Sequence, residues 1–270
     1  MPPVALTIAG SDPSGGAGIQ ADLKTFHQFQ VYGEAAITLL TVQNTRGVTR
    51  VEPAPAEIIR QQVEAVISDI PPQAAKTGAL GGVEQVEVIA AMAAAFAFPL
   101  VVDPVMMSKQ GARLLTSEAE SAVRTRLLPH CALVTPNIAE AEVLSGSTID
   151  DLTGVEEVVR RIAQLGPGAV LVKGGHLEGA PIDVLYFRGA IHRLRGKRVP
   201  TQHTHGTGCV FSAAITALLA HGLAIPDAVR SAKQFIQRAI ETAPGLGSGP
   251  GPVNLFASAS GPRQFIAASS

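Results

Sequence analysis

The sequence has little of several residue types on which common protein classes depend. Tryptophan is absent, aromatic residues make up 4% of the 270 positions, and the only cysteines are Cys131 and Cys209. These two cysteines form no CxxC pair and suggest no disulfide framework, which favours a reducing compartment. Because 46% of the residues are hydrophobic and few of them are aromatic, we expect a sizeable core of aliphatic side chains.

Long apolar runs and blocks of like charge are also missing. The most apolar window, Val88–Val102, is shorter than the roughly 18 residues that a membrane-spanning helix needs, and it contains Pro99. No basic segment precedes the apolar run that begins at Val4, so we expect no signal peptide. The net charge is −1, and no charge block indicates a nucleic acid or a membrane as partner. We therefore predict a soluble, cytoplasmic protein.

Short aliphatic runs alternate with helical patterns along most of the chain. The runs are continuous rather than alternating, which is typical of parallel strands covered on both faces. Ile59, Val63 and Val66 follow the spacing of one buried helix face, as do several residues of Val229–Ile240. This repetition predicts a doubly wound α/β sheet. The predicted strands are Val4–Gly10, Ala35–Asn44, Gln73–Gly78, Pro99–Val105, Ala132–Asn137 and Ala169–Gly175.

Two later segments depart from this alternation. Asp183–Gly196 consists of two short runs around Arg188-Gly189, which predicts a hairpin at the sheet edge. The basic stretch His192–Arg198 within and after it is interpreted as a solvated surface, with contact to a small anion as the alternative. Pro244–Asn254 is too rich in Gly and Pro for a regular element. With no repeat or linker, residues 1–270 are predicted to form one domain whose Gly/Pro-rich tail starts near residue 244.

The segment Gly206-Thr207-Gly208-Cys209 opens an apolar helical run. The first N–H groups of a helix lack internal partners, so this glycine-rich opening predicts an anion site. A thiol in the first helical turn has a lowered pKa and can act as a base or as a nucleophile. The plain alternative is a glycine turn followed by a buried cysteine that only packs.

The glycine-rich segments also suggest two other classes of site. His203, His205 and Cys209 could ligate zinc, but no second cysteine or acid lies at zinc-site spacing nearby. Gly16 and Gly18 begin a G-x-G-x-x-A pattern, which raises a dinucleotide-dependent oxidoreductase as an alternative. That function also needs an acid at the end of the second strand, where this chain has Gln43-Asn44.

Charged residues follow several of the predicted strands. Asp103 lies at a strand end before Pro104, and Lys173 ends another strand before two glycines. Asn137 and Glu140 form an N-x-x-E pattern between a strand and a helix, although Glu140 also suits a simple helix start. Ligands of such sheets bind at the carboxyl ends of the strands. An anion site, a lysine and carboxylates suited to Mg²⁺ at that edge indicate phosphoryl transfer.

Seven motifs together resemble one known family. They are "LTIAGSDPSGGAGIQADLKTF", "QNTRGV", "KTGALG", "VVDPVM", "TPNIAEAE", "VLVKGGH" and "THGTGC". In this order they are similar to the hydroxymethylpyrimidine/phosphomethylpyrimidine kinases of thiamin biosynthesis, in the ribokinase-like superfamily. The resemblance runs from about Val4 to Ala243. It implies a three-layer α/β/α fold with a mostly parallel central sheet and an edge hairpin, and a homodimer.

The resemblance also implies a reaction. Members use ATP and Mg²⁺ to phosphorylate the hydroxymethyl group of 4-amino-5-hydroxymethyl-2-methylpyrimidine, and then phosphorylate the monophosphate again. Matching positions imply pyrimidine binding by Gln43, Gly10, Ala17 and Asp22. They imply catalysis by Lys173 and by Gly206, Thr207, Gly208 and Cys209. They also imply phosphate contact by Asn137 and Mg²⁺ binding by Glu140. Asp103 is assigned to the nucleotide and its phosphates from its strand-end position.

Some positions depart from the family pattern. Lys109–Leu115 lacks a usual Asp, His203 stands for a usual Asn, and Val210 stands for a frequent Thr. None of these changes touches the implied chemistry. A pyridoxal/pyridoxine kinase of the same superfamily remains the alternative function, because both substrates are flat heteroaromatic rings with a hydroxymethyl group. A non-catalytic sensor is a further alternative, against which the intact Lys173 and Cys209 argue.

Overall fold

The computed structural model describes residues 1–109, 111–175 and 180–259. Gln110 of the Lys109–Leu115 stretch, His176 of the "VLVKGGH" motif and residues 260–270 of the predicted domain lie outside the described residues. Among the described residues, no helix is both long and apolar enough to cross a membrane.

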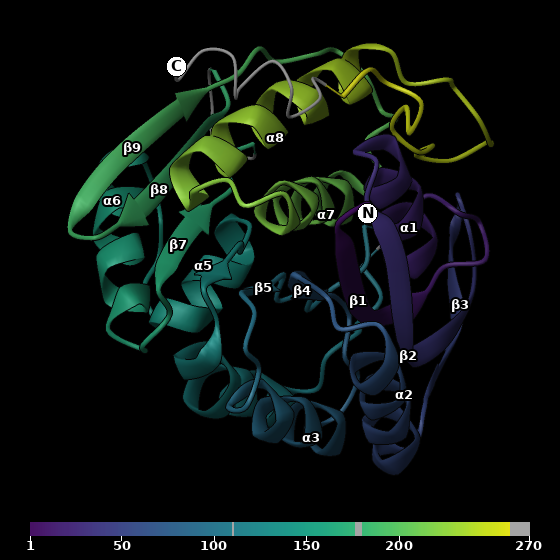
Figure 1. The fold of residues 1–270 in the computed structure, drawn as a ribbon. Helices are drawn as coiled ribbons and strands as arrows, with labels where there is room; N and C mark the ends of the chain where they lie inside the picture. Colours follow the sequence, from purple (N-terminus) through teal and green to yellow (C-terminus); the bar gives the residue numbers. More distant parts are fainter. Residues whose placement is uncertain (110, 176–179, 260–270) are drawn as a thin grey trace.

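One sheet of nine strands runs through the described part of the chain, in the order β3-β2-β1-β4-β5-β6-β7-β8-β9 (Figure 1). Its strands are β1 (Val4–Ser11), β2 (Tyr32–Asn44), β3 (Gly47–Pro53), β4 (Ala74–Thr77), β5 (Leu100–Val102), β6 (Leu133–Val134), β7 (Ala169–Val172), β8 (Ile182–Phe187) and β9 (Ala190–Arg195). All neighbours from β2 to β7 are parallel, whereas β3, β8 and β9 pair antiparallel at the two edges. The mostly parallel sheet with an edge hairpin is confirmed.

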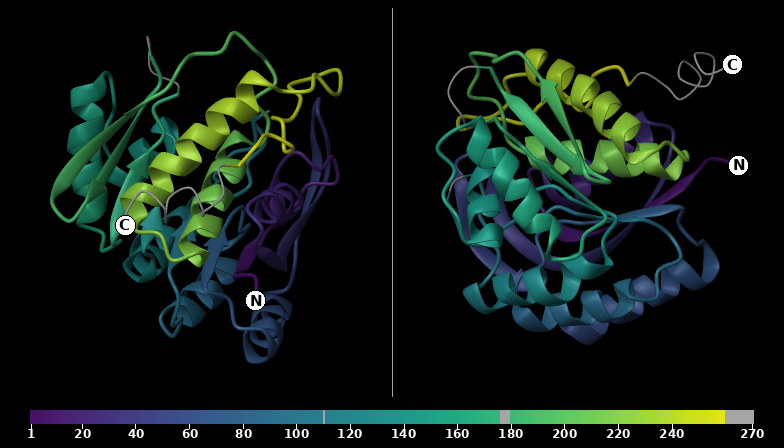
Figure 2. Two further views of the ribbon diagram at one scale, coloured as in Figure 1. Left: turned by 45° about the horizontal axis from the view of Figure 1, so that its top comes forward. Right: turned by 90° about the vertical axis from the view of Figure 1, so that its left-hand side faces the viewer.

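Helices cover both faces of this sheet. They are α1 (Gly18–Gln28), α2 (Ala56–Asp69), α3 (Val83–Ala93), α4 (Ser117–Ala122), α5 (Ile138–Ser145), α6 (Leu152–Ala163), α7 (Thr207–Ala220) and α8 (Ile225–Glu241). Successive strand residues point to opposite faces, so Leu133 packs in the core beneath α1, α7 and α8 while Val134 packs in the core beneath α2 to α6. Figure 2 shows the two helical layers with the sheet between them. The three-layer prediction is confirmed.

The strand predictions were right in order but missed β3. Its residues are mostly exposed or half-buried, so Gly47–Pro53 has no apolar run to mark it. It pairs with β2 and gives the sheet a second antiparallel edge. The predicted hairpin is confirmed as β8 and β9, with Arg188 (φ +48°) and Gly189 (φ +83°) at its turn.

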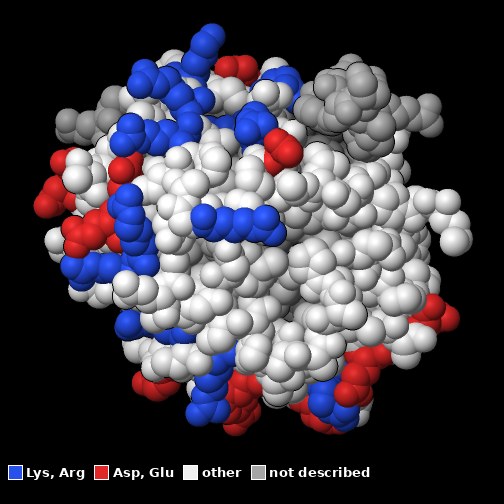
Figure 3. Space-filling model, turned by 60° about the vertical axis from the view of Figure 1, so that its left-hand side comes forward, with Lys and Arg blue, Asp and Glu red and all other residues white. Residues whose placement is uncertain are grey.

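The basic stretch at His192–Arg198 lies mainly on the surface. Arg193 on β9 forms an ion pair with Glu156 on α6 at 2.5 Å, and both side chains lie near the sheet edge. Figure 3 shows Lys and Arg side chains beside Asp and Glu side chains on this side of the molecule. The interpretation as a solvated hairpin therefore holds for Arg193, while Lys197 also reaches the cavity described next.

Candidate active site

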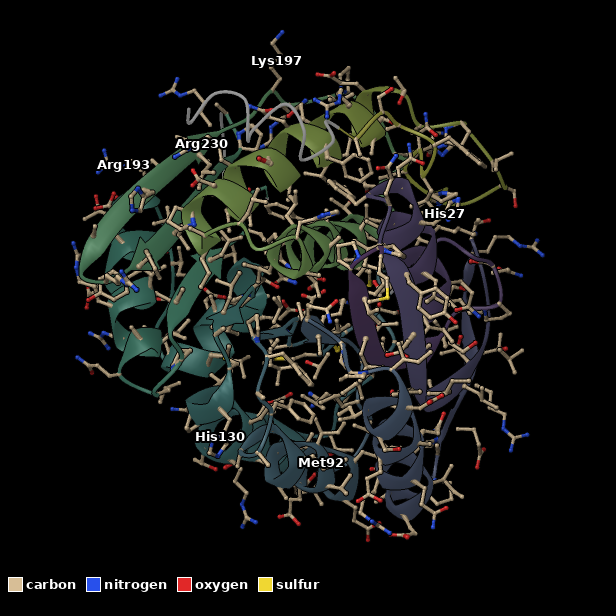
Figure 4. The ribbon with its side chains drawn as sticks, in the orientation of Figure 1. His27, Met92, His130, Arg193, Lys197 and Arg230 are labelled. Atoms are coloured by element: carbon tan, nitrogen blue, oxygen red, sulfur yellow. The ribbon has the colours of Figure 1, made fainter. Side chains whose placement is uncertain are left out.

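A cavity of about 450 Å³ lies at the carboxyl ends of the central strands. Its wall includes the predicted site residues Gly10, Ala17, Gln43, Asp103, Asn137, Glu140, Lys173, Gly206, Thr207, Gly208 and Cys209. Of the predicted set, Asp22 alone is not part of this wall. The cavity extends to Lys197, which Figure 4 shows projecting from the molecule beyond α8.

The start of α7, where the sequence predicts an anion site, lines the cavity. Gly206 precedes the helix with φ +75°, and a Cβ at this position would lie 1.7 Å from the carbonyl oxygen of Gly16. Only glycine tolerates both this backbone conformation and this approach. A Cβ at Gly208 would lie 3.2 Å from the Nζ of Lys173, so the helix opening directly faces the lysine.

Lys173 is held at the cavity by Asp103. Its Nζ donates to Asp103 Oδ1 at 2.9 Å, and Ser212 on α7 donates to Asp103 Oδ2 at 3.2 Å. Burial lowers the pKa of Lys173, but Asp103 and Glu140 outweigh burial and raise it above its ordinary value. The lysine is therefore a fixed cation next to the anion site.

Asn137 and Glu140 form a capping box at the start of α5. Asn137 Oδ1 accepts from the Glu140 N–H at 2.9 Å, and Glu140 Oε2 accepts from the Asn137 N–H at 2.8 Å. Burial raises the pKa of Glu140 to about 7 although Lys173 lowers it. The helix-start interpretation of Glu140 is confirmed, and the same residue lines the cavity, while its binding of Mg²⁺ stays a prediction.

The oxygen ligands on this wall fit a magnesium ion. Asp103 and Glu140 offer two carboxylates, and Mg²⁺ is commonly held by one or two carboxylates together with substrate phosphates. The described residues contain no cluster of three or more His, Cys, Asp or Glu side chains that could hold a metal by itself.

The predicted low pKa of Cys209 is wrong. Burial raises the pKa of its thiol to about 12, and Asp22 and Asp103 act in the same direction. Lys76 lowers this pKa but does not compensate for burial. The physical reason is desolvation by the protein packed around the Cys209 side chain, which disfavours a charged thiolate although the residue is partly open to the cavity.

The other end of the cavity holds the residues predicted to bind a pyrimidine. Gln43 lines the cavity at the end of β2, and its Oε1 accepts from the Thr41 hydroxyl at 3.2 Å. A Cβ at Gly10 would lie 2.5 Å from Leu39 Cδ1, which leaves no room for a side chain there. Ala17 donates its N–H to Asp12 Oδ2 at 2.9 Å.

Sequence reasoning missed the pair formed by Asp12 and His205. The His205 Nε2 lies 2.9 Å from Asp12 Oδ2 and 3.4 Å from the Gln43 amide nitrogen, and both members of the pair are buried. The zinc interpretation is wrong, because His205 is paired in this way and His203 accepts from the Gly251 N–H at 3.1 Å. Both residues lie in motifs of the sequence, but nothing in those motifs shows that positions 193 residues apart meet.

Asp22 and Lys76 form a second buried pair. Asp22 lies below the cavity rather than in its wall, where its Oδ2 accepts from Lys76 Nζ at 2.8 Å. Lys76 itself is part of the wall. The prediction that Asp22 belongs to the pyrimidine pocket is corrected accordingly. The Asp22 side chain has 0% exposure and forms an ion pair with Lys76 instead.

The G-x-G-x-x-A segment has an explanation within the fold. A Cβ at Gly18 (φ +56°) would lie 2.3 Å from the Gly10 carbonyl oxygen, and one at Gly16 would lie 2.6 Å from His205 Cδ2. These glycines let the loop pack against β1 and against the α7 opening. The dinucleotide interpretation is therefore not needed to account for them.

Comparison with known proteins agrees with this geometry. The model of the phosphomethylpyrimidine kinase family matches residues 12–254. A hydroxymethylpyrimidine/phosphomethylpyrimidine kinase of Streptomyces coelicolor is 45% identical over 253 residues, which cover 94% of each chain. The crystal structure of a phosphomethylpyrimidine kinase from Clostridium difficile matches with a TM-score of 0.79 and 44% identity, over 88% of this chain and 99% of the other.

A solved structure of a related kinase is similar in fold as well. An ADP complex of Bacillus subtilis pyridoxal kinase matches with a TM-score of 0.88 and 37% identity, over 95% of this chain and 98% of the other. Both the sequence relatives and the structural neighbours are therefore kinases. The match to the family model and the 45% identity over nearly the whole length show that the chain belongs to the phosphomethylpyrimidine kinase family, whose members are phosphotransferases of thiamin biosynthesis.

Proposed function

We propose that the chain transfers the γ-phosphoryl group of ATP to the hydroxymethyl group of 4-amino-5-hydroxymethyl-2-methylpyrimidine and then to the resulting monophosphate. The observation that carries this proposal is a single cavity with Gln43 at one end and Lys173 and the opening of α7 next to it. The Gln43 amide offers a donor and an acceptor together, which suits the edge of an aminopyrimidine.

The nucleotide would occupy the part of the cavity next to α8. This part is lined by Lys197, Lys233, Ile236, Gln237 and Ile240. Isoleucine side chains suit the face of a base, and the amide and lysine groups suit its edge and the ribose-phosphate. The related pyridoxal kinase of Bacillus subtilis has been solved with ADP, which supports ATP as the phosphate donor.

Each catalytic group has a role in the transfer. The N–H groups at Gly206–Cys209 and the Lys173 ammonium would stabilise the charge that develops on the transferred phosphoryl group. Asp103 and Glu140 would hold Mg²⁺, which when bound neutralises phosphate charge. Asn137 supports Glu140 through the capping box. Cys209, as a neutral thiol, positions the attacking hydroxyl, because a loose transition state needs little help from a base.

The test is turnover by the purified protein. ADP release from MgATP should occur with the hydroxymethylpyrimidine and with its monophosphate, while pyridoxal is slow or silent. Turnover of pyridoxal alone would indicate a pyridoxal kinase of vitamin B6 salvage instead. The fold similarity to the Bacillus subtilis pyridoxal kinase makes that the second candidate. Tight binding of the pyrimidine without turnover would instead favour a sensor.

The same proposal covers the domain organisation, the location and the oligomeric state of the protein. We infer one domain over residues 1–270, a cytoplasmic location and a homodimer. Leu40 and Val42, at 54% and 57% exposure, present apolar side chains from one face of β2 near the edge of the sheet and support an interface there.

A further inference from the structure

Two buried side chains lie next to Gln43, and the proposed chemistry gives them no role. Asp12 follows β1 and His205 lies just before α7, and 4% of each side chain is exposed. His205 Nε2 lies 2.9 Å from Asp12 Oδ2 and 3.4 Å from the nitrogen of the Gln43 amide. All three residues are part of the cavity wall, and Gln43 is only half-buried. The pair can therefore act on a substrate through Gln43.

The surroundings of Asp12 show which group donates in this pair. Its Oδ1 accepts from the backbone N–H and the hydroxyl of Ser14, at 2.9 and 2.7 Å, and its Oδ2 accepts from the backbone N–H of Ala17 at 2.9 Å. Burial raises the pKa of Asp12, but hydrogen bonds from His205 and Ser14 outweigh burial and lower this pKa below 3.8. Asp12 is therefore a carboxylate near pH 7, and a carboxylate only accepts hydrogen bonds.

His205 Nε2 consequently carries a proton and donates it to Asp12. This holds for the neutral imidazole with its proton on Nε2 and for the imidazolium, because both have an Nε2–H. The nitrogen then has no lone pair left for Gln43, and its single hydrogen offers Gln43 the longer branch of a bifurcated hydrogen bond. An oxygen 3.4 Å from Nε2 is therefore attracted, whereas an N–H group at the same place is repelled.

The Gln43 amide has two unfavourable neighbours in this arrangement. Its nitrogen faces the Nε2–H of His205, so two N–H groups oppose each other. Its oxygen faces the Thr41 hydroxyl at 3.2 Å, whose single hydrogen also has the Ser11 carbonyl as an acceptor at 3.0 Å. A half-turn of the amide, whose oxygen and nitrogen are similar in size, removes both conflicts. The amide oxygen then accepts from His205, and the amide nitrogen donates to the Thr41 oxygen.

We propose that Asp12 and His205 are positioning residues that determine substrate specificity, because they turn the Gln43 amide so that its oxygen lies next to His205; this inference rests on the proposed function. In this orientation the amide keeps one lone pair and one N–H for the ring, in a fixed order. The hydroxymethylpyrimidine offers the complementary groups, an amino donor at C4 and an acceptor at N3. A ring with the opposite order would place donor against donor and acceptor against acceptor.

Such a selection requires that the pair itself be fixed. An amide that turns freely serves a ring of either order, so it does not discriminate between the two. The Asp12 carboxylate is held by backbone N–H groups on both of its oxygens. His205 is held by its own N–H, which donates to the Gly251 carbonyl at 3.0 Å, and by Gly16, where a Cβ would lie 2.6 Å from its ring. The direction of donation therefore passes from the backbone through Asp12 and His205 to Gln43.

The test compares two rings of opposite order. The 4-oxo analogue of the hydroxymethylpyrimidine has a carbonyl acceptor at C4 and an N–H donor at N3. Calorimetry without ATP should give the wild type a dissociation constant at least about 100-fold lower for the amino ring, because the oxo ring leaves two polar groups unpaired. In His205→Leu the amide can turn, and this ratio of dissociation constants should fall below about tenfold.

Two further variants separate specificity from stability. His205→Gln keeps a side-chain N–H for Asp12 and for the Gln43 oxygen, so the ratio should return to within about threefold of the wild-type value. His27→Leu, at an exposed position on α1, is the control and should keep the wild-type ratio. Loss of folded protein lowers the number of binding sites for both rings equally, so the ratio does not depend on it.

Nitrogen NMR of the wild type with isotope-labelled histidine supplies a test that needs no variant. It should show a proton on His205 Nε2 near pH 8, and a bare Nε2 would overturn the proposal. Equal weakening of both rings in His205→Leu would mean that the pair is structural only. A wild type that binds both rings equally would exclude the selection as well. A wild type that binds neither ring, or that phosphorylates pyridoxal alone, would overturn the proposed function and this inference with it.

Discussion

At Cys209, two opposite effects act on one thiol. The helix start favours a thiolate, whereas burial and the nearby carboxylates of Asp22 and Asp103 favour the neutral form. Burial has the larger effect, and the pKa rises to about 12 even though the residue is partly open to the cavity. Cys209 is therefore better suited to orienting a hydroxyl than to removing its proton.

This pKa predicts slow alkylation of Cys209. The thiol is neutral below its pKa, so at pH 8 about one molecule in 10,000 carries a thiolate, against about one in ten for an ordinary cysteine of pKa 9. Iodoacetamide should modify Cys209 about 1,000-fold more slowly than a free cysteine, and the rate should still be rising at pH 10. Mass spectrometry of the Cys209 peptide measures this. A rate at pH 8 equal to that of free cysteine would contradict the raised pKa.

The Asp12 carboxylate predicts a pH-dependent contribution to stability. Burial acts to raise its pKa, but hydrogen bonds from His205 and Ser14 lower it below 3.8. A depressed acid stabilises the fold above its unfolded pKa, and this stabilisation is lost as the pH falls through the folded value. Asp12→Asn should cost about 1–3 kcal/mol at pH 7, the cost of disturbing buried charged hydrogen bonds.

Urea unfolding at several pH values checks this prediction. The difference in the free energy of unfolding between Asp12→Asn and the wild type should shrink below about pH 4, where Asp12 of the unfolded chain is protonated. Asp150→Asn, at an exposed position, is the control and should show little change. A difference that stays constant down to pH 3 would mean that the charge of Asp12 does not matter.

At the scale of elements, the two glycines at the start of α7 serve different purposes, Gly206 for stability and Gly208 for catalysis. At Gly206 an added methyl group meets the backbone of Gly16, which cannot move aside, in a conformation with φ +75°. At Gly208 the nearest atom to an added methyl group is the flexible end of Lys173 at 3.2 Å. The backbone conformation and packing therefore require glycine at position 206, whereas Gly208 leaves the space next to the Lys173 ammonium open.

Two alanine variants test this distinction. Gly206→Ala should destabilise the protein by more than about 1–2 kcal/mol, the cost of a left-handed backbone for a residue with a Cβ, and should abolish turnover. Gly208→Ala should keep or slightly raise stability, since alanine favours a helix by up to about 1 kcal/mol over glycine. Its kcat should nevertheless fall at least about tenfold, because Lys173 is displaced. Thermal melting and steady-state kinetics measure both, and equal effects at both positions would contradict the assignment.

At the scale of the whole molecule, the sheet has exposed apolar residues at one edge. Leu40 and Val42 are more than half exposed on β2, beside the antiparallel strand β3. We expect them to be covered in a homodimer. Light scattering after gel filtration should give a mass of twice the 27.9 kDa of one chain. The double substitution Leu40→Lys with Val42→Lys should reduce this mass to that of one chain. A wild-type mass of one chain would exclude the dimer.

The sequence by itself determined the α/β class, the succession of the parallel strands along the chain and the edge of the sheet at which the cavity lies. Continuous aliphatic runs can be buried only between two layers, and the polar motifs follow those runs directly. Sequence also located Gly206–Cys209 and Lys173, because these residues lie beside strand ends and a helix start.

Only the tertiary structure decided which side chains pair and what their charge is. Asp12 meets His205, Asp22 meets Lys76 and Asp103 meets Lys173 across 193, 54 and 70 residues of sequence. The raised pKa of Cys209 and the removal of Asp22 from the cavity wall follow from these pairings and from burial. Desolvation and non-local contacts depend on the packed arrangement of all layers, which no local pattern of residues contains.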